Sequence, residues 1–208
     1  MRKFLVRAIA VAVFSGGMAI TTGIIGAGTA MACGEENERS DRLAASMPQV
    51  NPGDTGQHVL ALQLSLRTEG YKYLNGTGNY VGNTLTAVKD FQQKNGINPS
   101  GIVGSKTWHA LVGQLPPSLT GNGNMTPPNF GITPGETNSD KMGYLYNAVM
   151  RIHPYRIDGS VNDTYEGVVL DAVKDFQRRA GINPSGIVGP KTWDAMYEVI
   201  AASGQWGC

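Results

Sequence analysis

The stretch AVKDFQQKNGINPSGIVGSKTWHA at residues 87–110 returns as AVKDFQRRAGINPSGIVGPKTWDA at residues 172–195, with five differences. The constant offset of 85 residues, from 87 to 172, indicates that one structural unit is duplicated within the chain. Because little of the 208-residue sequence lies outside the two copies and the segments that lead into them, the duplicated unit decides both the fold and the function.

The composition is that of a globular protein, with 41% hydrophobic and 16% charged residues. The formal net charge is +1, and the lysines and arginines are scattered along the chain. A nucleic-acid-binding protein normally carries a basic patch or stripe, so we expect no nucleic-acid partner.

The N-terminus has the pattern of a secretory signal peptide over 1–32. Three basic residues among the first seven precede an uncharged stretch at 8–34, and Ala-Met-Ala at 30–32 suits a signal peptidase. A retained membrane anchor is the rival interpretation, since the stretch is long enough to span a bilayer. Three threonines and the glycines at 16, 17, 23, 26 and 28 interrupt it, which favours cleavage and secretion, without a stable membrane span afterwards.

The two cysteines, Cys33 and Cys208, stand at the ends of the expected mature chain. Export permits a disulfide between them, which we rank first. Free thiols rank second. Acylation of Cys33 ranks third, because Ala-Met fits poorly before a lipoprotein cysteine.

Apolar periodicity predicts an all-α fold with two small three-helix domains. A charged segment over 33–49 lacks such periodicity and is expected to be a flexible leader. The first domain spans 50–113, with a helix ending near Gly70, a second over 84–95 and a short third helix beginning at Ser105.

The second domain spans 132–201 and follows the same plan, although its first half is degenerate, with Tyr146 in place of Gln63. Between the domains, residues 114–131 are rich in Pro, Gly and Asn and are expected to form a linker that lets the domains reorient independently. Residues 202–208 remain as a C-terminal tail.

The whole-domain pattern resembles the three-helix peptidoglycan-binding domain. The resemblance covers nearly all of 50–112, through P-G-D-x-G-x-x-V-x-x-L-Q, A-V-x-x-F-Q and G-I-V-G-x-x-T-W-x-x-L. The residues that carry it are Pro52, Gly53, Asp54, Gly56, Val59, Leu62, Gln63, Gly78, Tyr80, Thr84, Ala87, Val88, Phe91, Gln92, Gly101, Ile102, Val103, Gly104, Thr107, Trp108 and Leu111.

The second copy matches the family most strongly over 172–196 and departs from it at Tyr146, Asp163 and Val169. The resemblance implies a noncatalytic module that holds a secreted protein on bacterial cell-wall glycopeptide, usually beside a wall hydrolase.

No catalytic constellation is recognisable in the sequence. The histidines His58, His109 and His153 form no metal-binding motif, and there is no G-x-S-x-G turn. We therefore predict that the protein is not an enzyme and has no cofactor or metal site.

Ligand contacts are predicted at polar and aromatic residues outside the expected core, because sugar and stem peptide offer hydroxyls, amides and carboxylates. The first-copy candidates are Gln63, Arg67, Tyr73, Asn79, Tyr80 and Lys106, and the second-copy candidates are Arg151, Tyr155, Tyr165 and Lys191. Phe91, Phe176, Trp108 and Trp193 are expected in the core.

The sequence thus predicts a secreted, noncatalytic, cell-wall protein whose tandem modules bind peptidoglycan with avidity. A separate secreted wall hydrolase is a candidate partner. An alternative is an adaptor or inhibitor that holds a secreted protein through Tyr144, Tyr146 and Trp206. A second alternative is a peptidoglycan hydrolase with an unrecognised site.

Overall fold

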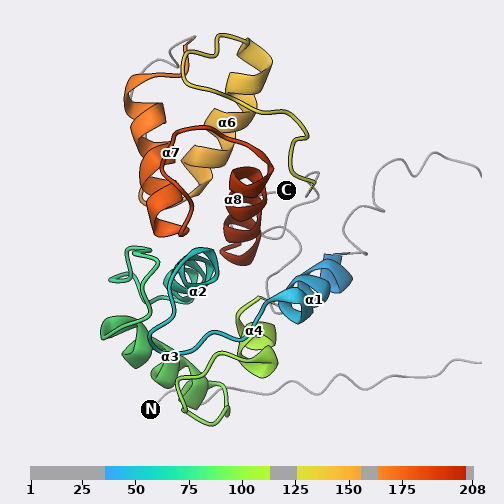
Figure 1. The fold of residues 1–208 in the computed structure, drawn as a ribbon. Coiled ribbons are helices and arrows are strands. Elements are labelled where there is room, and N and C mark those ends of the chain that lie inside the picture. Colours follow the sequence, from blue (N-terminus) through green and yellow to red (C-terminus); the bar gives the residue numbers. More distant parts are fainter. Residues whose placement is uncertain (1–35, 113–125, 156–163, 205–208) are drawn as a thin grey trace, which may run out of the picture. The chain divides into compact units, whose positions relative to one another are not determined.

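The computed structural model describes residues 36–112, 126–155 and 164–204. The expected signal peptide, both cysteines, Trp206 and most of the expected linker lie outside these ranges. The helices of the described ranges, shown in Figure 1, are α1 (Glu36–Ser46), α2 (Gln57–Thr68), α3 (Asn83–Lys94), α4 (Ser105–Leu111), α6 (Ser139–Arg151), α7 (Gly167–Arg179) and α8 (Pro190–Ala202). The described ranges hold no strands beyond isolated β-bridges, so the all-α prediction is confirmed. None of their helices is long and apolar enough to cross a membrane.

Each copy folds as three helices around one tryptophan. Helices α2, α3 and α4 form repeat one, and α6, α7 and α8 form repeat two (Figure 1). Trp108 and Trp193 are fully buried at the same place in each copy. The indole nitrogens donate to the backbone oxygens of Pro48 at 2.8 Å and Phe130 at 2.9 Å.

The duplicated stretch, residues 87–110 and 172–195, forms the same buried glutamine hydrogen bonds in both repeats. Gln92 lies in α3, and its side-chain nitrogen donates to Ile102 O at 2.8 Å, while its oxygen accepts from Gly101 N at 2.9 Å. Gln177 in α7 makes the matching bonds to Ile187 O and Gly186 N, each at 2.9 Å. These buried bonds satisfy the turn between the second and third helices, which explains why the turn sequence is duplicated unchanged.

The leader expected to be flexible contains α1. Ala44 and Met47 are buried, and α1 packs against α4. The prediction for this part of 33–49 is therefore corrected. Leu43 also packs against the core, so a few apolar residues dock this short helix although they leave no long periodic stripe in the sequence.

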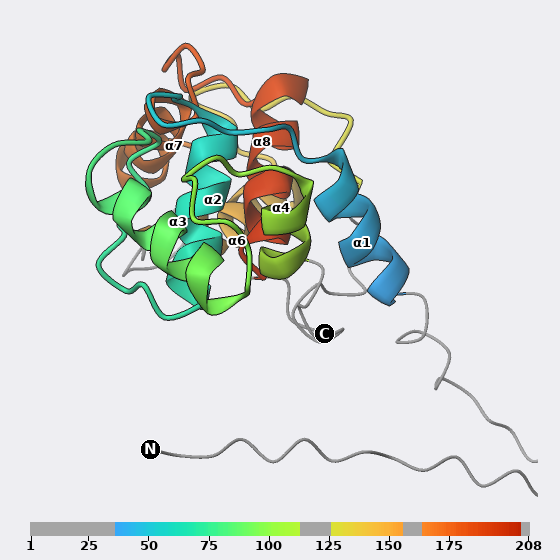
Figure 2. The ribbon, with the colours of Figure 1, turned by 90° about the horizontal axis from the view of Figure 1, so that it is seen from below.

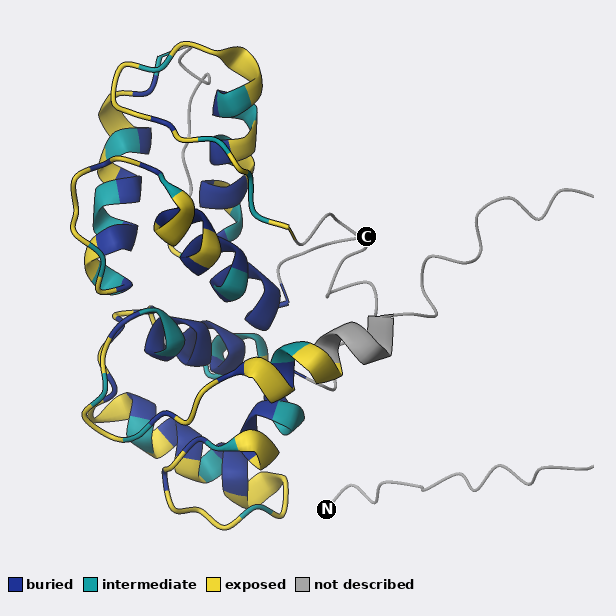
Figure 3. Cartoon of the chain, turned by 45° about the vertical axis from the view of Figure 1, so that its right-hand side comes forward, coloured by how far each residue is buried: buried dark blue, intermediate teal, exposed yellow. Residues whose placement is uncertain are grey.

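Helix α2 of repeat one packs against α8 of repeat two within a single compact unit (Figure 2). The Ser65 hydroxyl donates to Ala202 O at 2.8 Å, and the Thr68 hydroxyl donates to Ser203 O at 2.8 Å. Figure 3 shows buried residues on the facing sides of the helices. The repeats are thus joined by a buried helix contact, and the expectation that they reorient independently is corrected.

Candidate functional site

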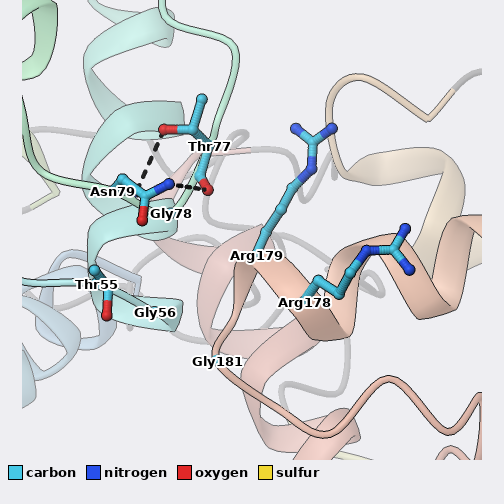
Figure 4. Close-up of a pocket in the computed structure, with 8 residues that line it drawn as sticks. All are labelled: Thr55, Gly56, Thr77, Gly78, Asn79, Arg178, Arg179 and Gly181. Carbon is cyan, nitrogen blue, oxygen red and sulfur yellow. Dashed lines mark hydrogen bonds between the residues drawn. The ribbon is translucent and has the colours of Figure 1, made fainter.

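A cleft of about 310 Å³ opens where the two repeats meet. Its repeat-one wall comes from the turn before α2 and the loop before α3, and its repeat-two wall comes from the end of α7 (Figure 4). We call it the inter-repeat cleft, and its lining residues are Thr55, Gly56, Thr77, Gly78, Asn79, Arg178, Arg179 and Gly181. Figure 4 shows both arginine side chains on one side and the threonines and Asn79 on the other.

Gln63 of α2 holds the repeat-one wall in place. Its side-chain NH2 group lies within donating distance of three oxygens: Thr77 Oγ1 at 3.1 Å, Asn79 O at 3.0 Å and Thr84 Oγ1 at 2.9 Å. Its oxygen accepts from Gly78 N at 2.9 Å. A buried amide that joins three loop residues to Thr84 at the start of α3 fixes the backbone, so the wall is preorganised before any ligand arrives.

Gly78 lets the two walls approach each other. Its φ is 71°, a conformation that favours glycine, and a Cβ at this position would overlap the backbone oxygen of Arg179. The close approach of the two backbones therefore depends on this residue.

The two arginines differ in their partners. Arg179 reaches across the interface, and its Nη1 donates to Asn75 O at 3.1 Å and Gly76 O at 2.9 Å, while its Nε pairs with Asp175 at 2.7 Å. Arg178 contacts Asp175 at 3.2 Å, and its side chain is 57% exposed. Arg179 thus links repeat two to repeat one, whereas the exposed guanidinium of Arg178 keeps N–H donors accessible to a ligand.

Asp175 keeps its negative charge beneath these arginines. Partial burial alone would raise the pKa of Asp175, but the Tyr155 hydroxyl donates to it at 2.7 Å, and the two guanidinium charges stabilise the carboxylate. The net effect lowers the pKa of Asp175 below its usual value. The ionised carboxylate pairs with both arginines, which line the repeat-two side of the cleft.

The chemistry of the cleft suits a small polar ligand with a carboxylate. An exposed guanidinium offers paired donors that match a carboxylate. Hydroxyl and amide groups on the opposite wall can pair with peptide amides. A peptide that ends in, or carries, a carboxyl group has this combination of groups.

Among the residues expected to contact ligand, Asn79 lines the cleft. Arg178, Arg179, Thr55 and Thr77 line it too, and they were not expected. Two of the five differences between the copies, Gln to Arg at 178 and Lys to Arg at 179, were the available signal. The sequence could not show that these two arginines line a cleft, because the cleft forms only when the two repeats pack together.

Three other candidates lie inside the fold. Gln63 is 2% exposed, and Tyr80 and Tyr165 are fully buried. The tyrosine hydroxyls donate to Gly101 O and, at 2.7 Å, to Gly186 O. We assign these residues to the stability of each repeat, because a buried hydroxyl with a backbone partner has no surface left for a ligand.

The remaining candidates do not line the cleft. Arg67 donates to the loop carbonyls of Lys72 and Leu74, and Tyr155 is half-buried against Asp175 and Arg179. Tyr73, Lys106 and Lys191 are exposed, and Arg151 is half-exposed at the end of α6. The structure therefore does not gather them into one site.

The family model of the peptidoglycan binding domain matches residues 55–111 and 142–196. Together these ranges cover more than half of the chain, and each falls on one three-helix repeat. The chain belongs to this family. The prediction of tandem peptidoglycan-binding domains is confirmed, and the family supports association with the cell wall.

Three relatives extend the comparison. A probable N-acetylmuramoyl-L-alanine amidase from Bacillus licheniformis is 30% identical over 71% of this chain and 44% of its own length. The N-acetylmuramoyl-L-alanine amidase CwlL from the same organism is 31% identical over 67% of this chain and 42% of its own. A Kitasatospora aureofaciens protein named "Uncharacterized protein in bpoA1 3'region" is 35% identical over 50% of this chain and 86% of its own.

The amidase relatives contradict the prediction that the protein is not an enzyme. They match about 70% of the chain, and both are named as amidases. The chain spans less than half the length of these two relatives. The absence of a familiar catalytic motif does not exclude catalysis, because active sites are also built from residues far apart in the sequence.

Proposed function

We propose that the two repeats bind peptidoglycan as a joined pair, with the inter-repeat cleft receiving a carboxylate of the stem peptide. The observation that carries this proposal is the exposed Arg178 guanidinium, held by Asp175 opposite the polar wall of repeat one. Family membership supports peptidoglycan as the ligand. The guanidinium and amide groups of the cleft favour the stem peptide as the part of peptidoglycan that binds there.

Joining the repeats changes how avidity arises. A flexible linker gives the second module an effective concentration near the polymer. Two modules that are packed together instead present their surfaces at one spacing, which reduces the ordering cost of binding. The buried hydrogen bonds from Ser65 and Thr68 to α8 support the second mode.

Co-sedimentation of the full chain with purified sacculi tests the proposal. We expect Arg178→Ala to weaken binding about tenfold, because a charge-assisted hydrogen bond is lost. Lys72→Ala is the matched control, since it removes a positive charge from an exposed position that does not line the cleft. Equal retention of both variants would assign binding to another surface, and a full chain that stays in the supernatant would reject peptidoglycan binding.

We infer that the protein also acts in amidase chemistry, hydrolysing the amide between the N-acetylmuramoyl group and L-alanine. The two amidase relatives support this second candidate. Incubation of sacculi with the full chain should release new L-alanine amino termini, measured by labelling of primary amines. Binding with no new amino termini would restrict the chain's own role to attachment.

A further inference from the structure

A second surface of repeat two lies outside the inter-repeat cleft. Tyr144 of α6 is 54% exposed, although Met142 and Leu145 of the same helix are buried. Aligning the buried Leu145 with Leu62 of α2 places Tyr144 opposite Ala61, which is fully buried in repeat one. The same helix position therefore belongs to the covered interior in one copy and to an open aromatic surface in the other.

The Tyr144 ring rests on an anchored aromatic neighbour. Its centroid lies 5.6 Å from that of Phe130, with the planes at 74°. Phe130 in turn packs edge-on against buried Trp193 at 6.0 Å, and its backbone oxygen accepts the indole bond. Such edge contacts stabilise a defined ring orientation, so Tyr144 is a supported platform and not a loose side chain.

Tyr144 also lines two hollows. One has a volume of about 510 Å³ and is lined by Ser139, Asp140, Gly143, Tyr144 and Asn147. The other, of about 320 Å³, is lined by Thr126, Pro127, Pro128, Asn129, Phe130 and Tyr144. An aromatic ring shared by two hollows with hydroxyl, amide and carboxylate groups at their walls suits two consecutive units of a polar polymer.

Gly143 gives an independent indication of a ligand. It lies within α6, where glycine is the poorest helix former apart from proline. Its φ is not positive, and an added Cβ would meet no atom within 4 Å. The chain itself thus gives no steric reason for glycine, whereas close approach of a bound molecule to the helix surface would give one.

We propose that this surface, which we call the Tyr144 platform, binds the glycan strand of peptidoglycan through its N-acetylhexosamine rings. The C–H face of a pyranose packs on the aromatic ring, while its hydroxyl and acetamido groups meet Ser139, Asp140 and Asn147. The polar walls favour a sugar over the apolar, fully desolvated contacts of a protein hot spot. This inference rests on the proposed function. It assigns the glycan strand to the Tyr144 platform and the stem peptide to the inter-repeat cleft.

Titration of the full chain with the tetramer of β-1,4-linked N-acetylglucosamine tests the platform without any stem peptide. We expect calorimetry to show binding that Tyr144→Ala weakens about tenfold and Tyr144→Phe largely retains. Gly143→Leu should abolish it by filling the hollow, while raising the melting temperature because leucine is the better helix former. Val168→Ala is the control, because Val168 is an exposed apolar residue of repeat two that lines neither hollow.

The outcomes separate this inference from the proposed function. Tetramer binding that is unchanged in both Tyr144→Ala and Gly143→Leu would overturn the platform, as would a lack of tetramer binding by a full chain that still sediments with sacculi. If the unmodified full chain does not bind sacculi, the proposed function itself is rejected. Capture of a secreted protein through Tyr144, with no tetramer binding, would also overturn the glycan assignment.

Discussion

Two buried glutamines, Gln92 and Gln177, each close one repeat by joining a helix to the following turn. Removal of either side chain leaves a buried glycine N–H and a carbonyl without their partners. We expect Gln92→Ala to lower the free energy of unfolding by about 2–4 kcal/mol, because each unsatisfied buried group is costly. Gln93→Ala, at the adjacent exposed position of α3, should change it by less than about 0.5 kcal/mol. Urea denaturation of the two variants measures the difference, and equal effects would contradict the assigned role of Gln92.

Gly78 and Gly96 permit a separate test of the close approach between the repeats. Their φ values are 71° and 68°, but only a Cβ at Gly78 would meet the backbone of Arg179, while one at Gly96 meets nothing within 4 Å. Both alanine variants share the backbone strain, so the difference between them reports the steric overlap. We expect Gly78→Ala alone to raise amide hydrogen exchange in α2 and α8. Similar exchange in both variants would show that the approach at Gly78 does not hold the repeats together.

At the scale of single residues, the sequence predicted the core better than the ligand contacts. Trp108, Trp193 and Phe176 are buried as expected, because apolar periodicity is a direct consequence of a helix with one covered face. Gln63 and Tyr80 were expected at the ligand, yet both are buried. A polar side chain within a repeated motif has two explanations, a ligand or a buried hydrogen bond, and only the three-dimensional partners distinguish them.

The elements were predicted nearly as well as the core. The second helix was expected over 84–95 and lies over Asn83–Lys94, and the third begins at Ser105 as expected. Turn and capping residues mark these ends in the sequence. Helix α1 was missed because its docking depends on contact with α4, which is a property of the folded repeat and not of the leader.

The contact between α2 and α8 carries a titratable pair, His58 and Glu198, 2.6 Å apart. The hydrogen bond to Glu198 raises the pKa of His58 above its usual value of 6.5, although partial burial opposes the shift. The protonated form is therefore favoured in the folded state, so the pair's contribution is complete below the unfolded pKa and is lost as the pH rises through the raised folded pKa.

Stability of the α2–α8 contact should accordingly fall between about pH 6 and pH 8, by less than about 1 kcal/mol because His58 is 39% exposed. Glu198→Gln should flatten this part of the pH profile. Thermal denaturation across the range measures both proteins, and an unchanged slope in the variant would assign the pH dependence to other groups.

At the scale of the whole molecule, the duplication concealed an asymmetry between the copies. Leu60 and Leu64 of repeat one are aligned with Gly143 and Asn147 of repeat two. Both leucines are buried, and α2 is the helix that α8 covers. The inter-repeat cleft exists only because of this contact, so no single repeat contains the complete site.

A charged residue introduced into the contact between the repeats should therefore affect the inter-repeat cleft and the Tyr144 platform differently. Ser65 is 2% exposed and bonds to Ala202, so Ser65→Arg places an unpaired charge in the α2–α8 contact and should separate the repeats, giving two unfolding transitions in calorimetry. Thr86→Arg, at an exposed position of α3, should keep the transition of the unmodified protein. Because the cleft needs both repeats and the Tyr144 platform needs only repeat two, Ser65→Arg should weaken binding to sacculi yet retain binding to the N-acetylglucosamine tetramer. Sacculus binding that persists in a protein with two transitions would mean that each repeat holds the wall alone, and the joined-pair mechanism would then be wrong.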